Sequence, residues 1–159
     1  MKILPIALLI LISPSIGFSQ DSQEKKDADQ IKEMIKKNGE EMRNTGKLSE
    51  SNMSAKGAHD FWSSGGMLVD LKPDFQYKFD EYNLAPKHIT VISLVPGKAA
   101  VAAYYNEGTF KPTNGNKVDH YLCRVTTVFV NENGKWKARH SHFSPVQGGS
   151  GTTQTSVDE

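Results

Sequence analysis

Three residues near the C-terminal end of the chain have types and spacing that suit chemistry: Trp136, His140 and His142. They fall at even spacing in a stretch that alternates apolar and polar residues, and even spacing on a strand places side chains on one face. A Trp and two imidazoles on one face are typical of a dry pocket that contains a few hydrogen-bonding groups, or of a subunit interface. The two histidines also have metal-like spacing, and His120 on the preceding strand could supply a third ligand. A His-x-His pair alone is weak support for a metal, so we expect pocket-wall or structural histidines, and neither a metal nor a cofactor.

Arg124 is a second candidate, and its role depends on the register of the hairpin that follows it. If residues 132–134 form a three-residue loop, Arg124 lies opposite His142 and shares its face. With a loop of two or four residues Arg124 faces the other way, because a one-residue slip moves every side chain to the opposite face. It then shares a face with Arg139, Ser141 and Phe143. A partly buried Arg can receive a carboxylate through two hydrogen bonds, whereas at an interface it forms a salt bridge, and both interpretations stay open.

Three aromatic residues are candidates for a pocket or a core: Trp62, Tyr82 and Tyr104. Each has an apolar body and a polar tip that requires a partner when it is buried. Two carboxylates, Glu107 and Asp119, could act as general bases if burial raised their pKa. On exposed strand positions they are ordinary solvated carboxylates, which is the interpretation that we favour.

Residues 1–19 have the pattern of a secretory signal peptide. Lys2 precedes an apolar run over residues 3–12, and small residues lie near position 19. The run is shorter than the ~20 residues that span a bilayer. We therefore expect export to the periplasm or the extracellular medium, and no membrane attachment once the signal is removed.

Charge and cysteine content limit the partners of the mature chain. The sequence has 19 Lys and Arg against 18 Asp and Glu, and removal of the leader takes away one lysine, so the remaining charges balance. Balanced charge argues against nucleic-acid binding, which needs a basic surface. The single cysteine, Cys123, cannot form a disulfide within the chain and is expected to be a buried apolar residue.

Helical spacing dominates the first half of the mature chain. Residues 21–42 predict a helix that is interrupted near Gly39, and residues 49–62 predict a second, shorter one. Residues 67–71 suit a short strand, and residues 75–83 suit a covering loop or helix.

Strands dominate the second half. They are expected at residues 89–95, 99–110, 118–130 and 136–143. The sequence therefore predicts an α+β fold, in which a strongly curved antiparallel sheet forms a cone with the N-terminal helices packed on its concave side. This domain spans residues 20–146, and a flexible tail rich in Gly, Ser and Thr is expected at residues 147–159.

Two stretches resemble the SnoaL-like, ketosteroid-isomerase-like superfamily, whose members share a cystatin-like cone. One runs from Arg124 through Gly134-Lys-Trp136 to His140-Ser-His-Phe-Ser144, and the other covers residues 86–105. Within the superfamily, Gly-Lys-Trp followed by His-x-His-x-Ser most resembles the association domain of calcium/calmodulin-dependent protein kinase. The resemblance implies a homodimer or larger ring assembled through the convex side of the sheet. It also implies a conical pocket that hosts small acids, steroids or polyketides.

The resemblance does not supply a catalytic set. Enzymatic relatives carry an Asp general base with a Tyr and an acid in an oxyanion hole, and the neighbours of Asp119 do not match that pattern. The kinase-associated relatives line the pocket with arginines and bind carboxylates without turnover. For that role Arg124 and Arg139 are the candidates in this sequence.

We therefore expect an exported homo-oligomer that binds a small ligand, anionic or partly apolar, in a conical pocket. The predicted ligand-binding residues are Trp62, Tyr82, Tyr104, His120, Arg124, His140 and His142. One alternative is an isomerase, dehydratase or hydrolase that uses a pocket acid/base, and another is a structural oligomerisation domain. A desolvated carboxyl group beside a Tyr or His deep in the cone would favour the enzyme. A cone whose polar residues are only Arg and His would favour binding. A cone filled by its own side chains would favour the structural role.

Overall fold

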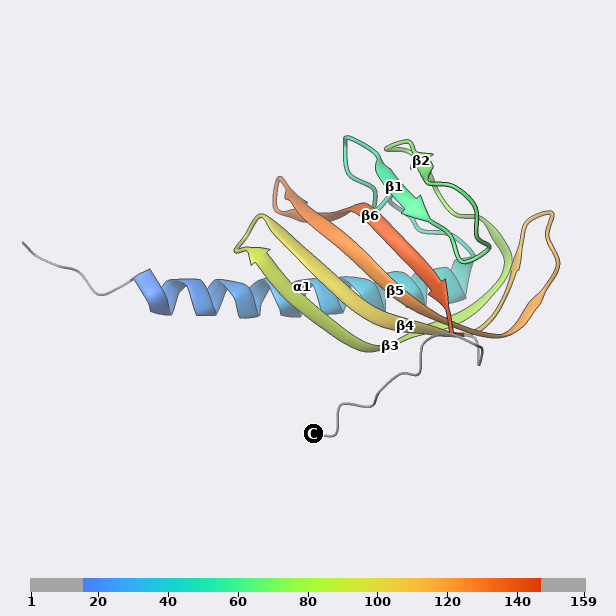
Figure 1. The fold of residues 1–159 in the computed structure, drawn as a ribbon, viewed down its shortest axis with the longest axis horizontal. Coiled ribbons are helices and arrows are strands. Elements are labelled where there is room, and N and C mark those ends of the chain that lie inside the picture. Colours follow the sequence, from blue (N-terminus) through green and yellow to red (C-terminus); the bar gives the residue numbers. More distant parts are fainter. Residues whose placement is uncertain (1–15, 147–159) are drawn as a thin grey trace, which may run out of the picture.

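The computed structural model describes residues 16–146, with side chains from residue 20 onward. The predicted tail and most of the predicted signal peptide lie outside the described residues. One helix is followed by six strands (Figure 1). The elements are α1 (Ile16–Thr45), β1 (Ala58–Phe61), β2 (Val69–Leu71), β3 (Phe79–Val95), β4 (Ala99–Pro112), β5 (Val118–Glu132) and β6 (Lys135–Pro145).

The strands form one curved sheet in the order β2-β1-β6-β5-β4-β3. Neighbouring strands are antiparallel except β1 and β6, which run parallel. Asn133 and Gly134, at φ 55° and 82°, close a two-residue turn between β5 and β6, which is the backbone that a tight hairpin needs. The predicted α+β architecture with a curved antiparallel sheet is confirmed.

Helix α1 lies across one face of this sheet and packs mainly on β3. Ile31 and Ile35 are buried against small residues of β4, Ala100 and Ala102. The interruption predicted near Gly39 is absent, and the helix continues to Thr45. Gly39 instead permits close packing, since a Cβ there would lie 3.1 Å from Pro86 Cδ. No helix within residues 16–146 has both the length and the apolar character required to cross a bilayer.

The second predicted helix, over residues 49–62, is wrong. Met53 forms a β-bridge with Ala138, and β1 pairs in parallel with β6. The side chain of Ser54 donates to Glu132 Oε1 over 2.6 Å. These partners are distant in the sequence, so tertiary hydrogen bonds override the local helical spacing. The short strand predicted at residues 67–71 is confirmed as β2, whereas β3 extends back to Phe79 and takes up part of the predicted covering segment.

An irregularity in the β5–β6 pairing separates residues that the sequence placed together. Val128 pairs with His140 and Phe129 with Ala138, so Arg139 is left as an extra residue. Such a bulge reverses the facing of the residues that follow it. Trp136 is therefore buried on the concave side, whereas His140 and His142 lie on the convex side. The prediction that these three residues share a face is wrong for this reason.

The same bulge settles the orientation of Arg124. The turn has two residues, which on a regular hairpin would place Arg124 on the face of Ser141 and Phe143. Because Arg139 is extra, Arg124 instead pairs with Ser144 on the face of His142.

Candidate ligand-binding cavity

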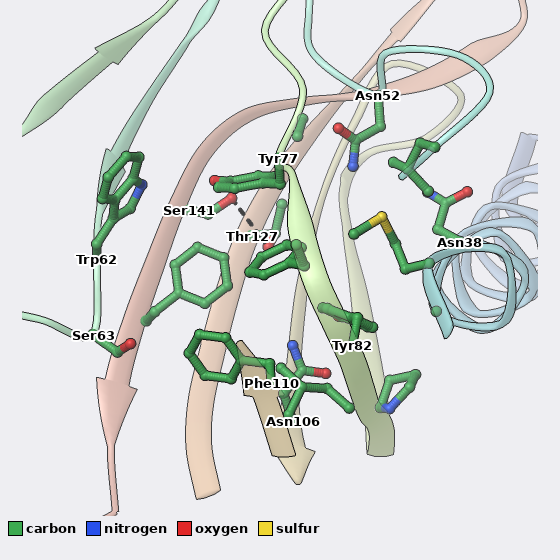
Figure 2. Close-up of a pocket in the computed structure, with 18 of the residues that line it drawn as sticks. Asn38, Asn52, Trp62, Ser63, Tyr77, Tyr82, Asn106, Phe110, Thr127 and Ser141 are labelled. Atoms are coloured by element: carbon green, nitrogen blue, oxygen red, sulfur yellow. Dashed lines mark hydrogen bonds between the residues drawn. The ribbon is translucent and has the colours of Figure 1, made fainter. Parts of the chain in front are cut away.

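A cavity of about 710 Å³ lies between α1 and the concave face of the sheet. Its walls come from α1, from strands β3 to β6 and from three loop segments, residues 48–53, 62–64 and 75–78. Figure 2 shows Trp62 on one side of the cavity and Asn38 of α1 on the other. The curvature of the sheet and the single helix therefore leave a hollow that the protein's own side chains do not fill.

Ten of the residues that line the cavity are aromatic, and several of their rings contact one another in series. The ring centroids of Phe75 and Tyr77 are 5.0 Å apart, and those of Phe79 and Tyr82 are also 5.0 Å apart. Phe110 and Tyr121 continue the series at 4.9 Å. Rings in edge-on and tilted contact make a stiff apolar surface.

A buried carboxylate lies behind part of this wall. Asp60 is 1% exposed. Its Oδ2 accepts a hydrogen bond from the Tyr77 hydroxyl at 2.7 Å, and its Oδ1 accepts one from the backbone N–H of Ser141 at 2.8 Å. Burial raises the pKa of Asp60, and the hydrogen bonds from Tyr77 and Ser141 offset this only in part.

The polar groups that face the cavity are neutral at neutral pH. Burial raises the pKa of Tyr77 and Tyr104 well above the ordinary range and that of Tyr82 to about 12, so all three phenols stay protonated. Four carboxamides also line the cavity, and within residues 16–146 their side chains have no hydrogen-bond partner. They are Asn38, Asn52, Gln76 and Asn106. The one charged lining residue, Lys78, is exposed at the surface.

The predicted site residues divide between the two faces of the sheet. Trp62, Tyr82 and Tyr104 line the cavity as expected. Four others do not line it: His120, Arg124, His140 and His142. His120 and Arg124 are exposed on β5, and His140 and His142 pack against the ring of Phe61 outside the cavity.

The remaining candidates also lie away from the cavity. Glu107 is exposed in an ion pair with Lys87, which holds the pKa of that carboxyl below its usual value. Asp119 is exposed. Arg139 donates to the backbone oxygen of Gly57, and Cys123 is buried, as predicted. Within residues 16–146 no three His, Cys, Asp or Glu side chains are arranged to hold a metal ion.

Sequence reasoning missed Asp60, Tyr77, Thr127 and Ser141. Asp60 fell within the predicted second helix. The inward direction of its side chain can be predicted only if residues 58–61, which lie between Gly57 and Gly65-Gly66, are treated as a strand. In that pattern Ala58 and Asp60 face inward while His59 and Phe61 face outward, which is what the burial shows.

Comparisons with known proteins agree with this fold. The sequence model of the SnoaL-like domain family matches residues 21–147. A solved NTF2-like protein of unknown function from Pseudomonas putida is 15% identical, with a TM-score of 0.52, over 76% of this chain and 87% of its own. At this identity the similarity concerns the fold alone.

Two further solved structures resemble the chain at lower TM-scores. The association domain of C. elegans CaMKII is 17% identical over 79% of this chain and 98% of its own, with a TM-score of 0.47. A cystatin-like protein from Caulobacter vibrioides is 12% identical over 83% of this chain and 91% of its own, with a TM-score of 0.43. No curated protein matches the chain.

Proposed function

Because the chain belongs to the SnoaL-like domain family, whose fold encloses a hollow here, we propose that it binds a small, neutral, largely apolar molecule in the cavity. The observation that carries the proposal is the open space of about 710 Å³ bounded by aromatic rings. Small-molecule sites are typically concave, mostly apolar and roughly 300–1,000 Å³ in volume. A ring-bearing ligand would bury its apolar surface against the aromatic wall.

The charge of the proposed ligand follows from the cavity wall, where the one cation among the described lining residues, Lys78, is exposed to solvent and not buried in the cavity. Arg124 is the residue expected to receive a carboxylate, and it lies on the other face of the sheet. A buried carboxylate without a charged partner is costly. The phenols and free carboxamides can instead receive hydroxyl, carbonyl or amide groups.

Acid–base catalysis is the second candidate, and Asp60 beside Tyr77 is the observation that favours it. The raised pKa of Asp60 resembles that of a catalytic acid or base. Both of its oxygens, however, already accept hydrogen bonds, and Tyr77 and Ser141 stand between the carboxylate and the cavity. Binding is therefore the preferred function. A purely structural role, which needs a cone filled by its own side chains, fits the open cavity poorly.

Self-association through the convex face forms a further part of the proposal. One ladder on that face runs from Ile92 through Val101 and Val128 to His140. Tyr105 and Leu122 are also exposed there. Solvated sheet faces normally carry polar residues, and an apolar face of this kind favours a partner. A second copy of the chain supplies a matching face.

Export is proposed from the sequence pattern alone. The buried residues of α1 begin at Asp27, so cleavage after residue 19 would leave the packed part of the helix intact. N-terminal sequencing of the protein recovered from a secreting host tests this proposal. A mature chain that still begins at Met1 would contradict it.

Binding of the neutral fluorescent dye Nile red tests the cavity. We expect saturable binding with a blue-shifted emission, because the dye enters an apolar site. Asn106→Trp fills the cavity from β4 and should weaken binding by at least about tenfold, or 1.4 kcal/mol. Ala103→Trp adds the same ring three residues earlier on the exposed face of that strand and serves as the control. Equal binding by both variants would place the dye outside the cavity and contradict the proposal.

A further inference from the structure

Three hydroxyl groups on the cavity wall lie in front of one buried carboxylate. The Tyr77 hydroxyl donates to Asp60 Oδ2 at 2.7 Å, and Ser141 donates its backbone N–H to Asp60 Oδ1 at 2.8 Å. Thr127 Oγ1 donates to Ser141 Oγ at 3.4 Å (Figure 2). Tyr77, Thr127 and Ser141 line the cavity, whereas Asp60 lies behind them.

The carboxylate fixes the direction of this chain of hydrogen bonds. An ionised carboxylate only accepts, so each group that touches it must donate. The proton of Tyr77 therefore points at Asp60, and the proton of Thr127 points at Ser141. The oxygens of Tyr77 and Thr127 turn their lone pairs, and not their protons, toward the cavity. The wall is consequently an acceptor surface, although it is built from groups that in isolation both donate and accept.

We infer that Asp60 sets the polarity of this wall and so selects ligands that place an alcohol, phenol or N–H donor against the Tyr77 oxygen. This inference rests on the proposed function, because it requires a neutral ligand in the cavity. A ligand oxygen without a proton finds no donor at this wall. Loss of one buried hydrogen bond lowers affinity by about tenfold. The carboxamides elsewhere in the cavity both donate and accept, so they do not discriminate in this way.

Two neutral probes separate this inference from the proposed function: 6-acetyl-2-naphthol and its methyl ether. Both have a carbonyl group for the carboxamides, and only the naphthol has a hydroxyl donor. In calorimetry at neutral pH we expect the naphthol to bind about tenfold more tightly than the ether. Equal affinities would overturn the inference and leave the proposed function standing. Failure of both probes to bind would overturn both.

Variants at the carboxylate test the cause of the preference. In Asp60→Asn the side-chain oxygen can keep the Ser141 N–H while the amide NH₂ faces the Tyr77 oxygen, which frees the Tyr77 proton to turn into the cavity. The preference for the naphthol should then shrink to about twofold or less, since one hydrogen bond no longer distinguishes the probes. Asp119→Asn makes the same change of charge at an exposed position and should keep the native preference.

A second variant covers the case in which Asp60→Asn does not fold. Tyr77→Phe keeps the ring in the aromatic wall and removes the acceptor oxygen, so the preference should fall in the same way. A native preference in either folded variant would show that Asp60 does not set the polarity of the wall, and would overturn the inference.

Discussion

At the scale of single residues, Asp60 couples stability to pH. Burial raises its pKa above the ordinary value of 3.8, and its hydrogen bonds lower it only in part. An acid with a raised pKa binds its proton more tightly in the folded state. Its contribution to the free energy of unfolding is therefore fully present below the unfolded pKa and is lost as the pH rises through the folded pKa.

Asp60→Asn removes this titration from the protein. The free energy of unfolding of the variant, minus that of the native chain, should rise as the pH increases from about 4 to about 8. Urea unfolding at several pH values measures the difference. Glu107→Gln is the matched comparison, because Lys87 lowers the pKa of Glu107. For this variant, the free energy of unfolding minus that of the native chain should fall over the same pH interval. A difference for Asp60→Asn that stays flat or falls would contradict a raised pKa.

At the scale of elements, the four long strands were predictable and the segment before them was not. Strands β3 to β5 contain β-branched residues, and the strands end at turn residues such as Pro96-Gly97 and Asn133-Gly134, so their signals are local. Residues 49–61 instead take their structure from β6 and from Glu132, far along the chain. No local pattern carries that information.

The residues of the candidate site also divide into those that the sequence could predict and those that it could not. Trp62, Tyr82 and Tyr104 were predictable because large aromatic residues in a cone seek its interior. Asp60 was not, because its strand was mistaken for a helix. The outward facing of His140 and His142 relative to Trp136 depends on one extra residue in β6, and a bulge of that kind leaves no mark in the alternation of the sequence.

The hydrogen bonds of Glu132 hold the segment that follows α1 against the sheet, and their strength can be tested by substitution. Its carboxylate accepts hydrogen bonds from Ser54 Oγ at 2.6 Å and from the backbone N–H of Ala55 at 2.9 Å, and the bond from Ser54 is the main cause of its lowered pKa. A hydrogen bond to a charged group contributes more than about 1 kcal/mol when it is buried. Because solvent screens the interactions of Glu132, we expect Glu132→Gln to lower the free energy of unfolding by about 1 kcal/mol at pH 7.

The pH dependence of that cost has a definite sign. Because the folded pKa of Glu132 is depressed, its contribution is present above the unfolded value of 4.5 and disappears as the pH falls through the folded pKa. Chemical denaturation of Glu132→Gln at pH 7 and in acid measures both effects. Glu50→Gln, which removes an exposed ion pair with Lys135, should change stability little. Equal stabilities of the two variants at pH 7 would show that the Ser54 contact does not fasten the segment.

At the scale of the whole molecule, one sheet presents two surfaces with different chemistry. The concave face holds the cavity, its phenols and its carboxamides, whereas the convex face holds the exposed apolar ladder with Arg124, His140 and His142. Of the residues that first suggested a site, Arg124, His140 and His142 therefore belong to the surface proposed for self-association, whereas Trp136 lies on the concave side. The proposed ligand binding and the proposed assembly use opposite sides of the same strands, so each can be disrupted alone.

The convex face can be tested through its most exposed ladder residue, Ile92, whose exposed fraction is 58%. We expect residues 20–159 to sediment as a dimer in analytical ultracentrifugation. Ile92→Glu places a charge in the interface, and in a two-fold assembly each substitution counts twice. Loss of ~1.5 kcal/mol of apolar burial per copy weakens the dimer by roughly 100-fold. Met67→Glu adds the same charge on the β1–β2 loop, away from this ladder, and should leave the dimer intact. If the native chain sediments as a monomer, or if both variants stay dimeric, the convex face is not the surface through which two copies meet.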